Sequence, residues 1–442
     1  MRRLSADFAE RLTHQLSLTY ASRSIRVGVS GRYSLIPPIG LSVHPLQDAA
    51  FSSLQTCSGT SRTPEIYGEI GFVVSVMTYV QLILDFGFLL SATAEVSLNR
   101  DNPERINQIY TVVFFTKVLL SVILFVPIYL MCRIVPRLES DTMLVFLYYV
   151  GYAVNALSPD FFYRGIENMK VITVRTILIK FVFVILIFVF LKEPSDYYVI
   201  PVLTFLGNLT ALITILIYTR LHYGIHLVFV PWALATSLIR QTIPFFISRI
   251  ASTLYTATNT FVLGLLYPMG PVLGYYTSTD KLVSAVKGVV SPVADSLYPY
   301  MTKRKDFKLI KRILIVAMPF IMGGAVFGWI YANKICVILF GEEYYDAGEL
   351  LQLLIPAMMV ILPSYILAFP TLNPLGLAKY ANRSNIYGAA FQMLGLLALF
   401  VTKFISIRTI CILTSCTECI VLVYRIFVIV RFKVRNEISI KT

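Results

Sequence analysis

The sequence predicts an all-α polytopic membrane protein, a bundle of about eleven helices that cross a lipid bilayer. Of its 442 residues, 57% are hydrophobic and 14% are charged, and the mean hydropathy is +0.73. A soluble domain carries about a quarter charged residues, so most of this surface does not face water. Apolar runs of roughly 20 residues recur, each long enough to cross a hydrocarbon core of about 30 Å. A β-barrel would instead show alternating segments of about 10 residues.

The positions of these apolar runs predict eleven membrane spans. In chain order they cover residues 69–91, 109–132, 142–163, 171–191, 197–219, 236–266, 272–300, 312–333, 349–371, 385–402 and 405–430. The spans at 236–266 and 272–300 are longer than a bilayer requires, which indicates tilt or interfacial turns. Several prolines fall within or near the spans, where neighbouring helices or hydroxyl groups can satisfy the carbonyls that proline frees.

Lys and Arg are distributed unequally between the two sets of loops. The loops after the first, third, fifth, seventh and ninth spans, together with the C-terminal tail, hold sixteen cations, and the other loops hold five. Because cytoplasmic loops carry an excess of Lys and Arg, the richer set and the C-terminus are predicted to be cytoplasmic. The same rule accounts for the net charge of +14 without a nucleic-acid partner.

Residues 1–63 differ in composition from the rest of the chain. They hold seven Arg, eleven Ser and no Lys, and they contain no apolar core of a signal peptide. This Arg- and Ser-rich, acid-poor composition resembles that of an organelle transit peptide. The segment has too little apolar surface to form a soluble domain, so we expect an atypical polar N-terminus.

No metal site or catalytic constellation is predicted from the cysteines and histidines. The chain has six Cys and four His, which are scattered, and Cys416 and Cys419 have a C-x-x-C spacing without a second pair of ligands nearby. A structural zinc site needs four such ligands, whereas cysteine in a membrane span normally acts as a small apolar residue. No cofactor is therefore expected.

Six blocks of sequence carry a family resemblance. They read TPEIYGEIGF (63–72), LILDFGFLLSATAEVSLNRDNPERINQIY (82–110), PDFFYRGIENMKVITV (159–174), FVLGLLYPMGPVLGYYTSTDKLVSAVKGVVSPVADSLYP (261–299), FGEEYYDAGELLQLLIPAMM (340–359) and NPLGLAKYANRS (373–384). In number and order they resemble blocks of the Wzx-type polysaccharide and O-antigen flippases. These flippases belong to the multidrug, oligosaccharidyl-lipid and polysaccharide (MOP) exporter superfamily. The resemblance extends over nearly all of residues 64–435.

The resemblance implies a fold of twelve helices in two lobes, here about residues 64–225 and 226–442, with both chain ends in the cytoplasm. This chain would supply family helices two to twelve, and unrelated sequence stands in place of the first helix. One hypothesis is that residues 1 to about 63 are read in a wrong frame or from a misassigned start. The alternative is a genuine divergent extension.

The resemblance also implies a function without enzymatic activity. A flippase of this type moves an undecaprenyl-diphosphate-linked oligosaccharide, an O-antigen or capsule repeat unit, across the bacterial inner membrane by alternating access. It would need no cofactor but would couple to a proton or sodium gradient. Its partners would be membrane lipid and the polymerase and chain-length proteins of the same pathway.

Two other functions stay open. A different MOP-type exporter, for lipids or drugs, is the nearer one, although a drug exporter would use an acidic cavity and the candidate residues here are balanced or cationic. A membrane polymerase or glycosyltransferase of the same pathway would need a large catalytic loop. The longest loop between the spans has about 15–20 residues, which disfavours that alternative.

Ionisable residues inside the spans mark candidate substrate paths, because they are costly in lipid. In the span 272–300, polar residues recur every three or four positions and therefore share one helical face. These residues are Thr277, Asp280, Ser284, Lys287, Ser291 and Asp295, with Lys281 beside them. A weaker stripe that includes Arg249 lies in the preceding span. We expect both stripes to line a central cavity. The alternative, a neutralising Asp280–Lys287 pair, must bridge two helical turns, about 10 Å.

The first half of the chain holds further charged candidates. Lys180 lies near the middle of its span, whereas Lys117 and Arg175 lie nearer span ends. We expect Lys117 to snorkel to the headgroups and Arg175 to set the topology. Arg164 and Glu167, in the block FFYRGIENMK, are predicted to close an internal gate or to meet the diphosphate, since an Arg fork suits phosphate oxygens. A plain structural ion pair is the alternative.

Asp85, in the block LILDFGF, is predicted either to accept an interhelical hydrogen bond or to titrate during transport. With Asp280, it is a candidate carrier of a coupling cation. The predicted substrate-binding residues are Arg164, Lys180, Arg249, Lys281 and Lys287. The predicted coupling or gating residues are Asp85, Glu167, Asp280 and Asp295.

Overall fold

A computed structural model describes residues 63–190, 194–267 and 270–441, which form helices joined by short connections, with no strand among them. The α-helices are α3 (Thr63–Asp85), α4 (Phe88–Leu98), α5 (Pro103–Ile134), α6 (Pro136–Glu139), α7 (Thr142–Ala156), α8 (Asp160–Gly165), α9 (Met169–Phe190), α10 (Val199–Tyr223), α11 (Trp232–Leu266), α12 (Val272–Arg304), α13 (Phe307–Ile330), α14 (Ala332–Phe340), α15 (Ala347–Ile366), α16 (Ala378–Val401) and α17 (Ile407–Lys441). Three shorter helical segments are η1 (Pro194–Tyr198), η2 (Glu342–Tyr344) and η3 (Leu367–Thr371). The hypotheses about residues 1–63 fall, apart from Thr63, outside the described residues.

The all-α membrane fold is confirmed, and each predicted span coincides with one or two helices. By length and composition, seven helical segments of the described chain are able to cross a membrane. The predicted spans at 142–163, 171–191, 236–266 and 272–300 are not among the seven. Some predicted spans are also interrupted: the first divides into α3 and α4, the third into α7 and α8, and the eighth ends after the break between α13 and α14.

Several helix ends follow from local sequence. The side chain of Asn102 accepts a hydrogen bond from the backbone amide of Arg105 at the start of α5, where Pro103 is the first helical residue. Asp306 caps α13 in the same way. Such caps satisfy amides that have no partner inside the helix. Gly224 ends α10 in the left-handed conformation, which glycine adopts without steric cost.

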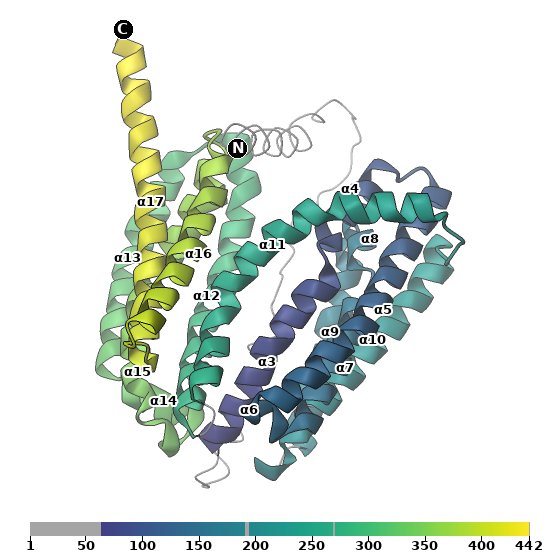
Figure 1. The fold of residues 1–442 in the computed structure, drawn as a ribbon. Helices are drawn as coiled ribbons and strands as arrows, with labels where there is room; N and C mark the ends of the chain where they lie inside the picture. The colour runs from purple at the N-terminus through teal and green to yellow at the C-terminus, as the bar shows by residue number, and fades with distance from the viewer. Residues whose placement is uncertain (1–62, 191–193, 268–269, 442) are drawn as a thin grey trace.

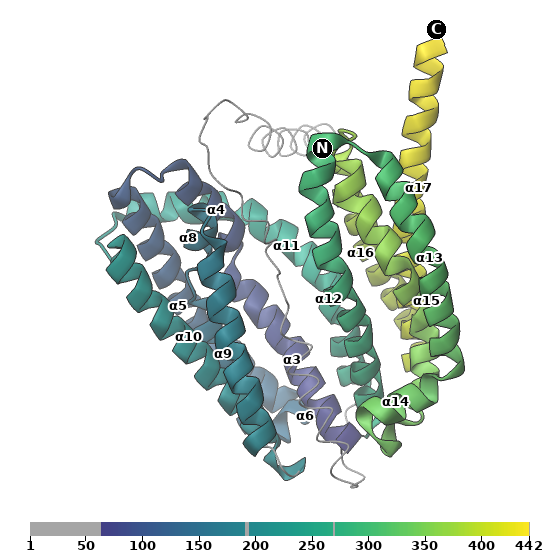
Figure 2. The same cartoon turned by 180° about the vertical axis from the view of Figure 1, so that it is seen from behind.

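The helices form two bundles, one of α3–α10 and one of α12–α17 (Figure 1). The long helix α11 crosses from the first bundle to the second, and α3 lies between the bundles in both views (Figures 1 and 2). The bundle axes meet near the first residues of α3 and α12 and diverge toward the opposite end. The connections α4–α5, α8–α9, α10–α11 and α12–α13, whose adjoining helix ends carry many of the cations of the richer set of loops, lie at that diverging end, as does the end of α17.

Small residues let α3 and α12 touch at the closed end. A Cβ atom on Gly68 would lie 2.9 Å from the backbone nitrogen of Gly274, and one on Gly274 would overlap the Pro64 carbonyl. Arg137 of α6 fits beside Gly68 and donates a hydrogen bond to the carbonyl of Tyr267, which follows α11. Burial lowers the pKa of this guanidinium, and the nearby carboxylates oppose that shift. We name this contact between α3, α6 and α12 the seam.

Candidate functional site

A break between α3 and α4 positions the first candidate residue. Phe86 and Gly87 have φ angles of 43° and 78°, so the helix stops at Asp85 and restarts at Phe88. A Cβ atom on Gly87 would lie 2.7 Å from the backbone nitrogen of Phe246 in α11. Only glycine fits both this backbone conformation and this approach. The break therefore places the Asp85 carboxylate beside α11.

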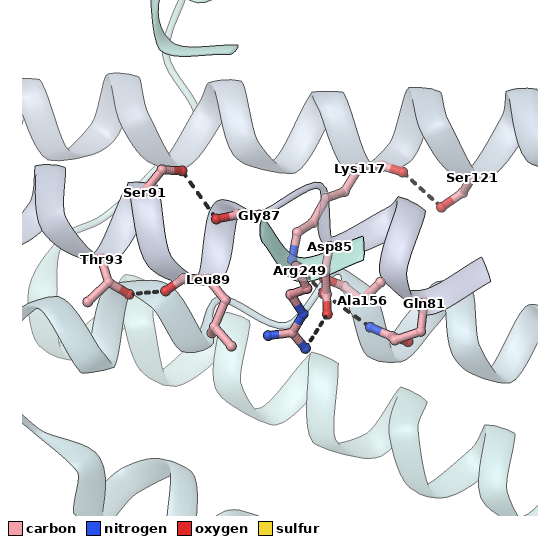
Figure 3. A network of polar contacts seen from close by, with 10 residues as sticks. All are labelled: Gln81, Asp85, Gly87, Leu89, Ser91, Thr93, Lys117, Ser121, Ala156 and Arg249. Carbon is pink, nitrogen blue, oxygen red and sulfur yellow. Dashed lines mark hydrogen bonds and ion pairs between the residues drawn. The ribbon is translucent and has the colours of Figure 1, made fainter. Parts of the chain in front are cut away.

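Asp85 lies between two cations from different helices (Figure 3). Its Oδ1 atom is 3.7 Å from Lys117 Nζ of α5, and its Oδ2 atom is 3.7 Å from Arg249 Nη2 of α11. Gln81, one turn earlier on α3, donates a hydrogen bond of 3.1 Å to Oδ1. The Asp85 side chain is 15% exposed and that of Arg249 is 37% exposed.

The end of α7 determines where Lys117 points. Lys117 Nζ donates a hydrogen bond of 2.6 Å to the carbonyl oxygen of Ala156, the last residue of α7. A carbonyl at a helix end has no amide one turn ahead to donate to it, and an ammonium group is a favourable substitute. The Lys117 side chain is only 7% exposed. The expectation that Lys117 snorkels to the headgroups is therefore wrong.

A pocket of about 120 Å³ adjoins this cluster. It is lined by Gln81, Asp85, Leu89, Lys117, Asn155, Ala156, Ser158, Asp160, Phe161 and Arg164. Asp160 accepts a hydrogen bond of 3.1 Å from Arg175 of α9, whose side chain is only 10% exposed, so Arg175 is a buried partner rather than a topology charge. Arg175 Nε and Nη1 are also buried without a hydrogen-bond partner among the described residues.

The charges around the pocket do not balance. Four cations, Lys117, Arg164, Arg175 and Arg249, surround two carboxylates, Asp85 and Asp160. The formal net charge of these six side chains is therefore +2. We name these six side chains the Asp85 cluster. A partly buried cluster with excess positive charge favours an anion that can offer several oxygen acceptors.

The structure separates two residues that the sequence predicted as a pair. Arg164 lines the pocket, whereas Glu167 forms a surface ion pair of 2.7 Å with Arg100 and is 76% exposed. The cause is local, because α8 ends at Gly165 and Glu167 has a φ angle of 61°. Asp85 is likewise not the lone carboxylate that its apolar neighbours in sequence indicate.

The second bundle contains a different charged contact. Lys287 of α12 donates a hydrogen bond of 2.8 Å to Glu418 Oε1 of α17. The Glu418 side chain is 8% exposed and that of Lys287 is 29% exposed. The sequence predicted Asp280 as the alternative ionic partner of Lys287, and the structure adds Glu418 as a hydrogen-bonded one. Glu418 was missed, although a carboxylate inside an apolar span is itself a signal.

The residues of the predicted polar stripe of α12 differ in their surroundings. Thr277 is 3% exposed, and its methyl group packs against Gly71 of α3, so it belongs to the contact between bundles. Ser284 is exposed, whereas Asp280 and Lys281 are partly buried. The side chains of Lys180 and Asp295 lie outside the part of the chain that is described.

Uncharged polar groups fill the interior between α11, α16 and α17. Gln392 donates a hydrogen bond to Asn259 Oδ1 and accepts one from Thr417, at 2.8 and 2.6 Å. Asn259 also donates to Thr414 at 2.9 Å. Among the described residues, no group of three or more His, Cys, Asp or Glu is placed to hold a metal ion.

Comparison with known proteins identifies relatives of this chain. Residues 63–305 match the model of a family described as polysaccharide biosynthesis protein. A protein of Shigella dysenteriae named as an O-antigen transporter is 27% identical over 341 residues, covering 75% of this chain and 83% of the relative. One of Escherichia coli K12 with the same name is 25% identical over 314 residues, covering 67% of this chain and 73% of the relative.

Two solved structures have a similar fold. The lipid II flippase MurJ in an inward closed conformation has a TM-score of 0.68 at 11% identity, covering 87% of this chain and 86% of MurJ. An inward-facing multidrug resistance MATE family transporter of the MOP superfamily also has a TM-score of 0.68, at 14% identity, covering 92% and 98%. At these identities the likeness concerns the fold alone.

Proposed function

Because the chain belongs to the polysaccharide biosynthesis protein family, we propose that it is a flippase for an undecaprenyl-diphosphate-linked oligosaccharide in the bacterial inner membrane. The substrate would be an O-antigen or capsule repeat unit. Two relatives named as O-antigen transporters support this proposal. The fold shared with a lipid II flippase is consistent with it.

The observation that carries the proposal is the net charge of the Asp85 cluster. A diphosphate that joins a lipid to a sugar carries one negative charge on each phosphate, which matches the excess of two cations. Lys and Arg donate strong charge-assisted hydrogen bonds to phosphate oxygens. The Gln81 Oε1 atom is buried and accepts no hydrogen bond from the described residues, so a sugar hydroxyl could donate to it.

A drug exporter of the same superfamily is the second candidate. It would hold organic cations against the carboxylates of an acidic cavity. In the Asp85 cluster, the carboxylates of Asp85 and Asp160 are each already in contact with cations. An organic cation would add positive charge to a cluster that already has an excess, so the cluster favours the anionic substrate.

Transport would follow from the arrangement of the two bundles. The bundles touch at the seam and diverge at the end where the cation-rich loops lie. If that end is cytoplasmic, as the distribution of Lys and Arg predicts, the headgroup enters from the cytoplasm. Rocking of the bundles would then open the seam and release the headgroup outside. The lobe boundary near residue 225, the cytoplasmic C-terminus and coupling to a proton or sodium gradient are parts of this proposal.

The proposal can be tested by complementation. Expression in a bacterial strain that lacks its own O-antigen flippase should restore surface polysaccharide, measured on gels and with antibody. Lys117→Gln should lower this restoration about ten- to hundredfold, because a hydrogen bond to a charged group contributes about 1.5–3 kcal/mol. The matched control is Lys379→Gln, since Lys379 is exposed on α16. Equal restoration by both variants, at equal abundance in the membrane, would show that Lys117 does not belong to the substrate site.

A further inference from the structure

We infer that the Asp85 carboxylate is an internal competitor for the anionic headgroup, because it contacts Lys117 and Arg249, two cations that the headgroup would use. The headgroup would then replace Asp85 as the partner of Lys117 and Arg249 when it binds. This inference rests on the proposed function, because it assigns a role to Asp85 within the same site.

The contact distances indicate that Asp85 can be displaced. Both of its ion pairs measure 3.7 Å, which is beyond hydrogen-bond distance. The short bond of Lys117, at 2.6 Å, goes to the Ala156 carbonyl instead. An arriving anion could therefore replace Asp85 beside Lys117 without breaking the hydrogen bond that holds the lysine at the end of α7.

A displaced Asp85 would keep a partner. Gln81 Nε2 donates a 3.1 Å hydrogen bond to it from the same helix, so this contact does not depend on Lys117 or Arg249. Asp85 is also the last residue of α3, next to the break at Phe86 and Gly87. A carboxylate at a helix end has more room to change direction than one in a continuous helix.

The exchange would also alter the connection between α3 and α11. Arg249 lies on α11, which crosses between the two bundles, and its contact with Asp85 ties that helix to α3 (Figures 1 and 3). A diphosphate that takes Arg249 would loosen this tie. An anion bound in the pocket would therefore weaken the contact that holds α11, the helix that joins the bundles, to α3.

The charged groups near Asp85 together keep an excess of positive charge when Asp85 is neutralised. Lys117 faces it from α5 and Arg249 from α11, while the α8 residues Asp160 and Arg164 line the same pocket. Removal of the Asp85 charge would therefore raise the local charge from +2 to +3. An anion should then bind more tightly, whereas a merely structural bridge predicts weaker binding in a loosened site.

The test uses the full chain in nanodiscs of uncharged lipid, with inorganic pyrophosphate as the probe and titration calorimetry as the readout. Asp85→Asn should bind pyrophosphate about tenfold more tightly than the wild type, because one competing charge is gone. Lys117→Gln should bind it about tenfold more weakly. The control Asp101→Asn removes the same charge from an exposed loop and should leave affinity unchanged.

Equal or weaker binding by Asp85→Asn, with an unchanged melting temperature, would overturn the inference. Absence of pyrophosphate binding by the wild type would instead contradict the anion site of the proposed function. If the Asp85→Asn variant fails to fold, amide hydrogen exchange of the wild type alone still tests the inference. Pyrophosphate should speed amide hydrogen exchange in residues 82–90 and 244–252, and slower exchange there would contradict the release of Asp85.

Discussion

The two bundles use buried charge in different ways. In the first, Asp85 lies 3.7 Å from each of two cations beside a pocket, within a cluster of net charge +2. In the second, Lys287 and Glu418 form one contact of 2.8 Å, and the Glu418 side chain is 8% exposed. The first arrangement leaves an excess of positive charge that can bind another anion. In the second, Lys287 and Glu418 neutralise each other.

This difference separates exchangeable charges from structural ones. A close pair is strongly destabilised when one partner is removed, because the other charge is left uncompensated. A longer contact between charges has a weaker attraction, so another ion can replace it more readily. We therefore propose that the Asp85 cluster binds the substrate and that the Lys287–Glu418 pair is structural.

The largest expected effect is on the second bundle. Glu418→Ala should lower the free energy of unfolding by about 3–5 kcal/mol, because Lys287 would lose the carboxylate that neutralises it. Guanidinium or thermal unfolding of the purified protein in detergent measures this. The double variant Lys287→Met, Glu418→Leu should regain most of the loss. A cost below about 1 kcal/mol for the single variant would show that the pair is not structural.

The seam is expected to give a smaller effect. Gly274→Val would force the first turns of α3 and α12 apart, since even a Cβ atom overlaps the Pro64 carbonyl. Overpacking of this kind costs about 1–3 kcal/mol. The variant should favour conformations open at the seam, which cysteine cross-linking between the first turns of α3 and α12 would detect as a lower yield. Gly324→Val is the control, because no atom lies within 4 Å of a Cβ atom there. An unchanged yield would mean that the seam does not hold the bundles together.

A double-mutant cycle on Asp85 and Arg249 tests the comparison through a smaller free-energy difference. Their coupling in unfolding experiments should be below about 1 kcal/mol, since the contact is long and Arg249 is 37% exposed. The same cycle on Lys287 and Glu418 should give a clearly larger value. Similar couplings for the two pairs would break the distinction between the bundles.

The smallest effect concerns a thiol in the second bundle. Burial raises the pKa of Cys336 to about 12, so the thiol stays protonated and unreactive at pH 8. Asn155→Cys would introduce a thiol that lines the pocket of the first bundle. A methanethiosulfonate reagent should modify the introduced thiol but not Cys336, as located by mass spectrometry. Equal modification would show that water reaches both places.

Much of the fold could be predicted from the sequence. Each of the eleven spans predicted from apolar runs coincides with one or two helices of the described chain, because the length of a bilayer crossing and the cost of charge in lipid act on each segment separately. The break at Phe86 and Gly87 was not predicted, since it depends on how closely α11 approaches Gly87. The division of the third predicted span into α7 and α8 was also missed.

The candidate site was only partly predictable. The apolar neighbours of Asp85 and the polar stripe that includes Arg249 predicted these two residues separately, and Lys117 was predicted to contact the headgroups. Its burial depends on the Ala156 carbonyl, which is 39 positions away in sequence. Glu418 was not predicted, because its partner Lys287 is 131 positions away in sequence.

The sequence by itself determined that this chain is a helical membrane protein, which ends of its helices carry the cations, and which ionisable residues lie inside apolar spans. These properties depend on composition and on the order of residues along each segment. Only the tertiary structure decided which charges meet. Ion pairs join helices far apart in the chain, and their partners depend on helix breaks and close packing that no local pattern encodes. The same residue types therefore form a cationic pocket in one bundle and a closed pair in the other.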